Sequence, residues 1–149
     1  MAHVELSFLG YFEAKRDGLP MPGFATHKAR ALLAYLAVEA GRPHSRERLA
    51  SLFWPERSEE QAHTSLRNAL TELRHTLGEK PDYSPILEIE RDKVQLNRTP
   101  ECWIDVAAFE ELVAEAEYAL EHTGDLPSAM RYMQEAISLY RGISWKALF

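Results

Sequence analysis

Residues 58–78 read SEEQAHTSLRNALTELRHTLG and predict one long amphipathic helix. Ser58 and Gln61 form a capping-box pattern at its start, and Gly78 is a typical C-terminal stop. The apolar side chains fall within an arc of about 100°, the usual width of a core-facing stripe. They are Ala62, Leu66, Ala69, Leu70, Leu73 and Leu77. One side of this helix is therefore expected to be buried, and the other is open to solvent or to a partner.

The opposite face of this helix has an unusual composition. It lacks the dense mixture of Glu and Lys that is found on ordinary solvated faces. An ordinary solvated face remains the alternative interpretation. Arginine pairs with guanine, asparagine with adenine, and threonine contacts the thymine methyl group. A DNA major groove about 12 Å wide admits one such helix. We therefore predict that bases are read by Thr64, Arg67, Asn68 and Thr71, with Arg74 and His75 one turn later on phosphate.

The N-terminal residues alternate between apolar and polar. Val4, Leu6 and Phe8 share one face of a strand, and an Asp17-Gly18 turn leads into the short segment 19–21. This alternation, with a turn rich in residues that tolerate positive φ, predicts a small antiparallel meander.

Two helices are expected between the meander and residue 58. The first is capped by Thr26 and closed by Gly41, and the second is capped by Ser45 and stopped at Trp54-Pro55. Helix N-termini and nearby basic side chains both attract phosphate, so DNA phosphate contacts are predicted here. The residues are Thr26, Lys28 and Arg30 for the first helix and His44, Ser45 and Arg46 for the second. The expected core residues are Ala29, Leu32, Leu33, Leu36 and Ala40, then Leu49, Leu52 and Phe53.

A β-hairpin follows the long helix. Leu87 and Ile89 alternate on one strand, Val94 and Leu96 on the next, around a polar turn at 90–93. A sheet, three helices and a hairpin in this order are typical of a winged helix-turn-helix. Arg91 and Lys93 at the hairpin tip are predicted phosphate contacts, an ordinary charged turn being the alternative.

From residue 105 the pattern is helical only. One apolar stripe runs from Val106 to Leu120, Gly124-Asp125 interrupts it, and a second runs from Ala129 through Met133 to Tyr140. This predicts an αα-hairpin. The expected fold is mainly α with small antiparallel β, a winged helix-turn-helix over residues 1–98 and a helical hairpin over residues 103–149.

Charge separates the two parts. The chain carries a net charge of −6, and residues 101–149 hold 3 basic and 9 acidic residues, whereas residues 1–100 hold 14 of each. Residues 26–48 hold five basic and two acidic residues. Only the first part is therefore expected to face phosphate.

Several function classes are disfavoured by what the sequence lacks. A single cysteine, Cys102, excludes an internal disulfide framework and fits a reducing cytoplasm, where we expect the protein. No apolar run approaches the roughly 20 residues that span a bilayer, so no membrane partner is expected. No spacing joins the acidic residues to a nucleophile, a phosphate loop or a metal set, so neither an enzyme nor a cofactor is expected.

Read in order, the motifs resemble a known family. They are Ala25–Leu36 (ATHKARALLAYL), Pro43–Glu47 (PHSRE), Leu52–Pro55 (LFWP), Ser65–Leu70 (SLRNAL), Leu73-Arg74, Leu77-Gly78, the WIDVxxF pattern at 103–109 and the Gly124-Asp125…Leu139–Gly142 ending. Over about residues 3–142 they resemble the SARP-type activators. These pair an OmpR-like winged helix with a TPR-like bacterial transcriptional activator domain (BTAD).

The resemblance implies binding to direct repeats in promoters and recruitment of RNA polymerase. In OmpR-like domains the loop between the second and third helices often touches the polymerase. Here that loop contributes Trp54, Glu56, Arg57 and Glu59. A BTAD normally has several helical repeats, and one pair leaves apolar surface uncovered. We therefore expect the C-terminal helices to form a homodimer or to dock a partner, the alternative being a monomer whose tail folds over the domain.

The main rival function is a protein-interaction module. Such a winged helix would have lost DNA binding and would dock a partner through its acidic helical segment. That loss is expected to leave acidic residues on the outer face of the long helix. Arg67, Asn68 and Arg74 occupy it instead, which favours DNA binding.

Overall fold

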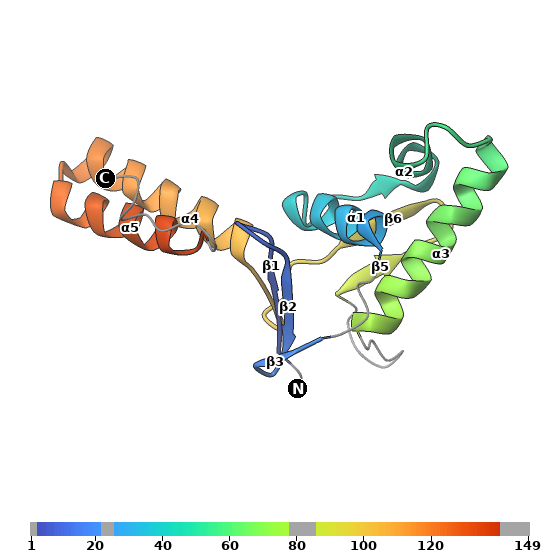
Figure 1. The fold of residues 1–149 in the computed structure, drawn as a ribbon. Helices are drawn as coiled ribbons and strands as arrows, with labels where there is room; N and C mark the ends of the chain where they lie inside the picture. Colours follow the sequence, from blue (N-terminus) through green and yellow to red (C-terminus); the bar gives the residue numbers. More distant parts are fainter. Residues whose placement is uncertain (1–2, 22–25, 78–85, 141–149) are drawn as a thin grey trace.

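A small sheet at the middle of the molecule separates two helical lobes (Figure 1). The structure, a computed structural model, describes residues 3–21, 26–77 and 86–140. The winged-helix lobe contains α1 (His27–Val38), α2 (Arg46–Phe53), α3 (Glu59–Leu77) and a β-hairpin. The helical lobe contains α4 (Asp105–Tyr118) and α5 (Leu126–Ser138).

The middle sheet has the strand order β3-β2-β1-β7. Its first three strands, β1 (Val4–Ser7), β2 (Glu13–Arg16) and β3 (Leu19–Pro20), form the predicted antiparallel meander. Asp17 and Gly18 have φ of 50° and 83°, as the predicted turn requires. A fourth strand, β7 (Cys102–Ile104), was not predicted and pairs parallel to β1. A three-residue strand has too little periodicity to be recognised from its own sequence.

Asp105, the first residue of α4, ties the helical lobe to this sheet. Its side chain is buried, with 1% of the residue exposed. The carboxylate accepts hydrogen bonds from the backbone N–H groups of Phe8, at 2.9 and 3.0 Å, and Leu9, at 2.9 Å. The first turn of α4 is therefore held against the end of β1.

The predicted N-caps of the three helices in the winged-helix lobe are confirmed. The hydroxyl oxygens of Thr26, Ser45 and Ser58 each accept a hydrogen bond at 3.2 Å from the backbone N–H three residues later. Gly41, with φ of 88°, follows α1, and its N–H donates to the carbonyl of Leu96 at 2.7 Å. The predicted stop at Gly78 lies outside the described residues.

The core of the winged-helix lobe forms where α3 packs on α1 and α2. The predicted α3 stripe is confirmed, because all six of its apolar side chains are buried: Ala62, Leu66, Ala69, Leu70, Leu73 and Leu77. The prediction for Leu52 is wrong, since this residue is 52% exposed while Leu49 and Ala50 are buried. The eight-residue α2 touches the core along one narrow side, and Leu52 lies about 100° around the helix from it.

The hairpin, called the wing below, consists of β5 (Leu87–Ile89) and β6 (Lys93–Leu96). Leu87 lies opposite Leu96 and Ile89 opposite Val94, which confirms the predicted turn at 90–93. A further short strand, β4 (His44–Ser45), pairs with β6 on the other side. It was not predicted, and it joins the start of α2 to the wing.

The helical lobe is an antiparallel pair whose turn is a π-helical segment, η1 (Ala119–Thr123), followed by Gly124 at φ 62°. Its small core contains Ala116, Ala119 and Ala129. The predicted stripes are too wide, because Leu120, Met133 and Tyr140 are exposed. Two helices bury only the strip along which they touch. No helix in the described part of the chain is long and apolar enough to cross a membrane.

Asp125 begins α5 as its N-cap. The backbone N–H of Ser128 donates to Oδ1 at 3.0 Å, and its hydroxyl donates to Oδ2 at 2.7 Å. The hydroxyl bond is the main reason that the pKa of the Asp125 carboxyl lies below its usual value. The turn between the two helices is thus held by local bonds.

Candidate nucleic-acid interface

The outward face of α3 is exposed as predicted. Thr64, Arg67, Asn68 and Thr71 lie on it, opposite the buried stripe, and Arg74 and His75 continue it one turn later. The hydroxyls of Thr64 and Thr71 donate to the carbonyls of Glu60, at 3.1 Å, and Arg67, at 2.9 Å. These bonds occupy the hydroxyl hydrogens, so each oxygen keeps its acceptor capacity.

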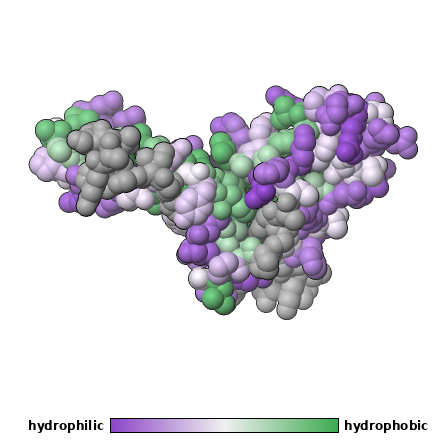
Figure 2. Space-filling view, in the orientation of Figure 1, coloured by the Kyte–Doolittle hydropathy of each residue, from purple (hydrophilic) through white to green (hydrophobic). Residues whose placement is uncertain are grey.

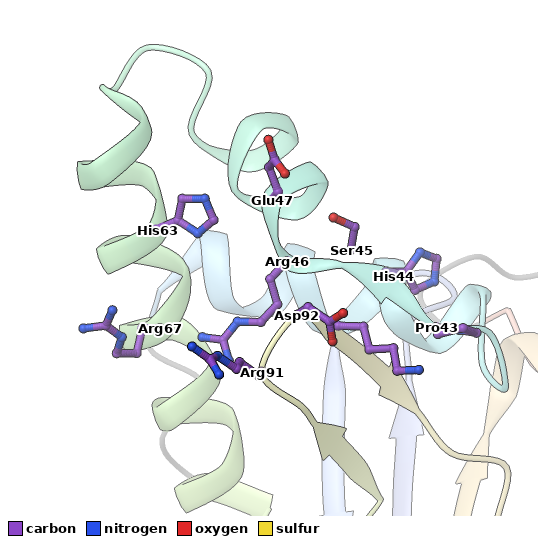
Figure 3. Close-up of a pocket in the computed structure, with 10 residues that line it drawn as sticks. Pro43, His44, Ser45, Arg46, Glu47, His63, Arg67, Arg91 and Asp92 are labelled. Carbon is purple, nitrogen blue, oxygen red and sulfur yellow. The ribbon is translucent and has the colours of Figure 1, made fainter.

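Beside this face lies a hollow of about 870 Å³, called the basic hollow below. It opens between α3, the start of α2 and the tip of the wing (Figure 3). It is lined by Pro43, His44, Ser45, Arg46, Glu47, His63, Arg67, Arg91, Asp92 and Lys93. Tertiary structure therefore brings together predicted phosphate contacts from two separate segments, the start of α2 and the wing, beside the predicted base contact Arg67.

The wing is fixed to the start of α2 by backbone bonds. Arg46 N–H donates to the Asp92 carbonyl at 2.9 Å, and Arg46 Nη1 donates to the Glu90 carbonyl at 3.1 Å. These bonds extend the pairing of Ser45 with Lys93 in β4 and β6. The position of the wing relative to the start of α2 is therefore set by the fold.

The basic hollow carries more positive than negative charge. Lys93 Nζ lies 3.4 Å from a carboxylate oxygen of Glu90. Within the described residues, Arg46, Arg67 and Arg91 form no ion pair with a carboxylate. Their guanidinium groups remain available to an anion, although Glu47 and Asp92 also line the hollow.

Two of the predicted phosphate contacts have partners within the protein. Lys28 Nζ donates to the carbonyl of Phe53 at the end of α2 and lies 5.8 Å from the centre of the Trp54 ring. The ring of His44 packs edge-on against Tyr35 at 5.2 Å, and its Nε2 is buried. The prediction that His44 contacts phosphate is therefore wrong for this nitrogen, because phosphate cannot reach it.

The remaining predicted phosphate contacts at the start of α1 lie apart from the basic hollow. Thr26 Oγ1 lies 3.5 Å from Glu72 of α3, and Arg30 Nη2 lies 3.3 Å from His27 Nδ1. None of these residues lines the hollow. The predicted phosphate contacts therefore form three groups: those at the basic hollow, those at the start of α1, and Arg74 and His75 in the last turn of α3.

The loop between α2 and α3 corrects a further prediction. Trp54 was predicted to contact a protein partner, but it is only 6% exposed and belongs to the core. Glu56, Arg57 and Glu59 are exposed. Arg57 Nη1 donates to Ser65 Oγ on α3 at 2.6 Å, which holds the loop against the helix. A hollow of about 400 Å³ lies between this loop and α2.

Sequence reasoning missed His63, which lines the basic hollow. Its side chain lies on the flank of α3, between the buried stripe and the outward face. Periodicity separates only those two faces, so it carried no signal for a residue on the flank. Groups able to hold a metal ion, three or more His, Cys, Asp or Glu together, are absent from residues 3–21, 26–77 and 86–140.

The surface of the two lobes differs in character. Figure 2 shows hydrophilic residues covering most of the visible face over α2 and α3. Hydrophobic residues gather near the middle of the molecule and at the far end of the helical lobe. The polar side of the molecule is thus the one that carries the predicted DNA contacts.

Comparison with known proteins agrees with this geometry. Residues 23–93 match the family model described as "Transcriptional regulatory protein, C terminal". That family is a domain of transcription regulators and not a class of enzymes. A search of curated proteins found no match.

A solved structure is similar over nearly the whole chain. It is Mycobacterium tuberculosis EmbR in complex with a low-affinity phosphopeptide, with 26% sequence identity and a TM-score of 0.70. The match covers 99% of this chain and 38% of that one, so this chain spans well under half of the EmbR chain. The two matches confirm a winged helix followed by a helical segment, and they confirm the resemblance to SARP-type regulators.

Proposed function

We propose that this chain, a SARP-type DNA-binding transcriptional regulator, activates transcription by binding specific double-stranded sequences in promoters. One observation carries the proposal. The exposed face of α3 presents Arg67 and Asn68, and the basic hollow lies directly beside it. Groups that discriminate bases and groups that hold phosphate therefore share one surface. Bacterial promoters lie in the cytoplasm, where we place the protein.

In the proposed complex α3 lies in the major groove. Thr64, Arg67, Asn68 and Thr71 read base edges, while the wing and the start of α2 hold the backbone on one side. The start of α1, with Thr26 and Arg30, holds the backbone on the other. Arg74 and His75 contact phosphate beyond the bases that are read. The division of the chain at residues 98 and 103 remains a prediction.

The first test removes the proposed base contacts. Arg67→Ala and Asn68→Ala should each weaken binding to the preferred duplex by about 1–3 kcal/mol and relax preference at one base pair. Folding should not change, because both side chains are exposed. The duplex is selected from a random pool with the wild-type protein, and affinities are then measured against its single-base variants.

Gln134→Ala, at an exposed position of α5 in the other lobe, is the control and should bind like the wild type. If both α3 variants keep full affinity and unchanged base preference, α3 does not read the DNA. The rival function, a winged helix that docks a protein without binding DNA, would then gain support.

A second prediction concerns salt. The logarithm of affinity should fall with the logarithm of salt concentration, with a slope of about −0.9 per phosphate neutralised. Arg46→Ala should make this slope shallower by about 0.9, the value for one phosphate, and should leave base preference unchanged. Arg131→Ala, an exposed arginine of α5, should leave the slope as it is. An affinity indifferent to salt would show that phosphate contacts do not support binding.

Two partners belong to the same proposal. Glu56, Arg57 and Glu59 in the α2–α3 loop would contact RNA polymerase when the protein is bound to direct repeats. Exposed apolar residues of the helical lobe would form a homodimer. Leu126, Met130 and Met133 recur on one side of α5 at helical spacing, and each is at least 41% exposed.

A further inference from the structure

His63 enters the basic hollow from α3 and has no role in the function proposed above. Its ring is half-buried at the wall of the hollow. Figure 3 shows the imidazole turned into the hollow, whereas the guanidinium of Arg67, one turn later, points outward. His63 therefore lies beside the surface that would read bases.

Two guanidinium groups approach the same space from other elements. Arg46 reaches across from α2 to the Glu90 carbonyl, 3.1 Å away, on the residue directly before Arg91. Figure 3 shows Arg46 and Arg91 below the ring of His63. Neither arginine forms an ion pair with a carboxylate within the described ranges. Cations gathered from separate elements repel one another until an anion enters between them.

We propose that His63, Arg46 and Arg91 form a site for one DNA phosphate, in which protonated His63 supplies the third positive donor. The site extends the proposed function and depends on it. Arginine binds phosphate oxygens with charge-assisted, often bidentate bonds, and an imidazolium adds one more such donor. The site lies on the flank of α3, where the backbone that borders the groove would run.

The imidazole makes this contact depend on pH. A phosphate favours the charged imidazole, so binding takes up a proton. The charged imidazole donates from both ring nitrogens and carries a positive charge, and both contributions are lost as pH rises through the range in which imidazoles ordinarily titrate. Affinity should therefore fall between about pH 6 and about pH 8.

Other charged or titratable residues line the hollow with His63. They are Arg46 and Glu47 of α2, His44 of β4, Arg67 of α3, and Arg91, Asp92 and Lys93 of the wing. Glu59 and Glu60 precede His63 on α3 itself. Carboxyl, lysine and arginine groups ordinarily keep one charge state between about pH 6 and about pH 8. The other histidine among these residues is His44, whose Nε2 is buried. The difference between the pH profiles of the wild type and a His63 variant therefore isolates the imidazole of His63.

The test measures affinity for a random-sequence DNA duplex across this pH range at fixed ionic strength, since a phosphate contact needs no particular base. The wild type should lose about three- to tenfold in affinity from the acid to the neutral end. His63→Gln should lose most of this pH dependence and stay near the weaker level, and His63→Lys should lose most of it near the tighter level; any dependence that remains belongs to His75, the other histidine placed on phosphate. His122→Gln, in the helical lobe, should behave like the wild type.

The salt slope gives a second readout that a structural role of His63 would not change. In the wild type the slope should be steeper at about pH 6 than at about pH 8. In His63→Gln this difference should be smaller by at most about 0.9, and any difference that remains belongs to His75. Thermal melting of each variant shows whether it is folded, and His63→Lys keeps the test valid if the glutamine variant is not.

The outcomes separate the two proposals. If the wild type binds no DNA at any pH, the proposed function fails and the phosphate site fails with it. If DNA is bound but His63→Gln keeps the wild-type pH profile and the pH-dependent slope, only the assignment of His63 is overturned.

Discussion

Replacement of Leu73 by alanine should lower the free energy of unfolding by about 2–5 kcal/mol, because it leaves a cavity in the middle of the α3 stripe. Leu73 has no exposed surface and packs in the main core cluster. The effect can be measured by urea denaturation, followed by the fluorescence of Trp54 in the same cluster. DNA contacts should be preserved wherever the variant remains folded.

Leu52→Ala is the matched control, since it makes the same chemical change on the neighbouring helix. Leu52 is half-exposed, so its truncation should cost less than about 1 kcal/mol. Equal losses of stability for the two variants would contradict the burial of Leu73 and the exposure of Leu52.

Replacement of Asp105 by alanine should be comparably destabilising, although no apolar contact is lost. The change leaves the N–H groups of Phe8 and Leu9 without their acceptor. An unsatisfied donor in a fully buried site costs about 1–3 kcal/mol, and these part-buried donors should each cost toward the lower end of that range. Urea denaturation measures the total, and faster hydrogen exchange at these two amides should show that the loss arises where α4 meets β1.

Two further variants provide reference values for the loss of stability in Asp105→Ala. Asp105→Asn keeps one acceptor oxygen and should lie between wild type and alanine. Asp125→Ala removes an exposed helix cap, which costs about 0.5–2 kcal/mol and should leave exchange at Phe8 and Leu9 unchanged. An Asp105→Ala protein as stable as the wild type would mean that the joint between sheet and α4 does not depend on this carboxylate.

Most residues of the proposed interface could be predicted from local sequence, with clear exceptions. The outward face of α3, including Arg67 and Asn68, follows from helical periodicity alone. The basic hollow does not, because it depends on how far the wing stands from α3. His63 was missed for this reason, and the buried Nε2 of His44 could not be foreseen.

Taken by itself, the sequence determined the features whose causes lie within a few residues of one another. Thr26, Ser45 and Ser58 begin the three helices because a side-chain oxygen there reaches a backbone N–H three residues later. The Asp17-Gly18 turn follows from the positive φ that these residues tolerate. The buried stripe of α3 follows from about 3.6 residues per turn.

Tertiary structure alone decided the features that join distant segments. The parallel pairing of β7 with β1 and the bonds from Asp105 to Phe8 and Leu9 connect segments almost a hundred residues apart in the chain. Leu52 is exposed and Trp54 buried because the packing of α2 determines which side of it meets the core. Local periodicity shows which residues share a face of one element. Which element covers that face depends on how distant segments come together and pack. No short stretch of sequence contains both of the segments that meet.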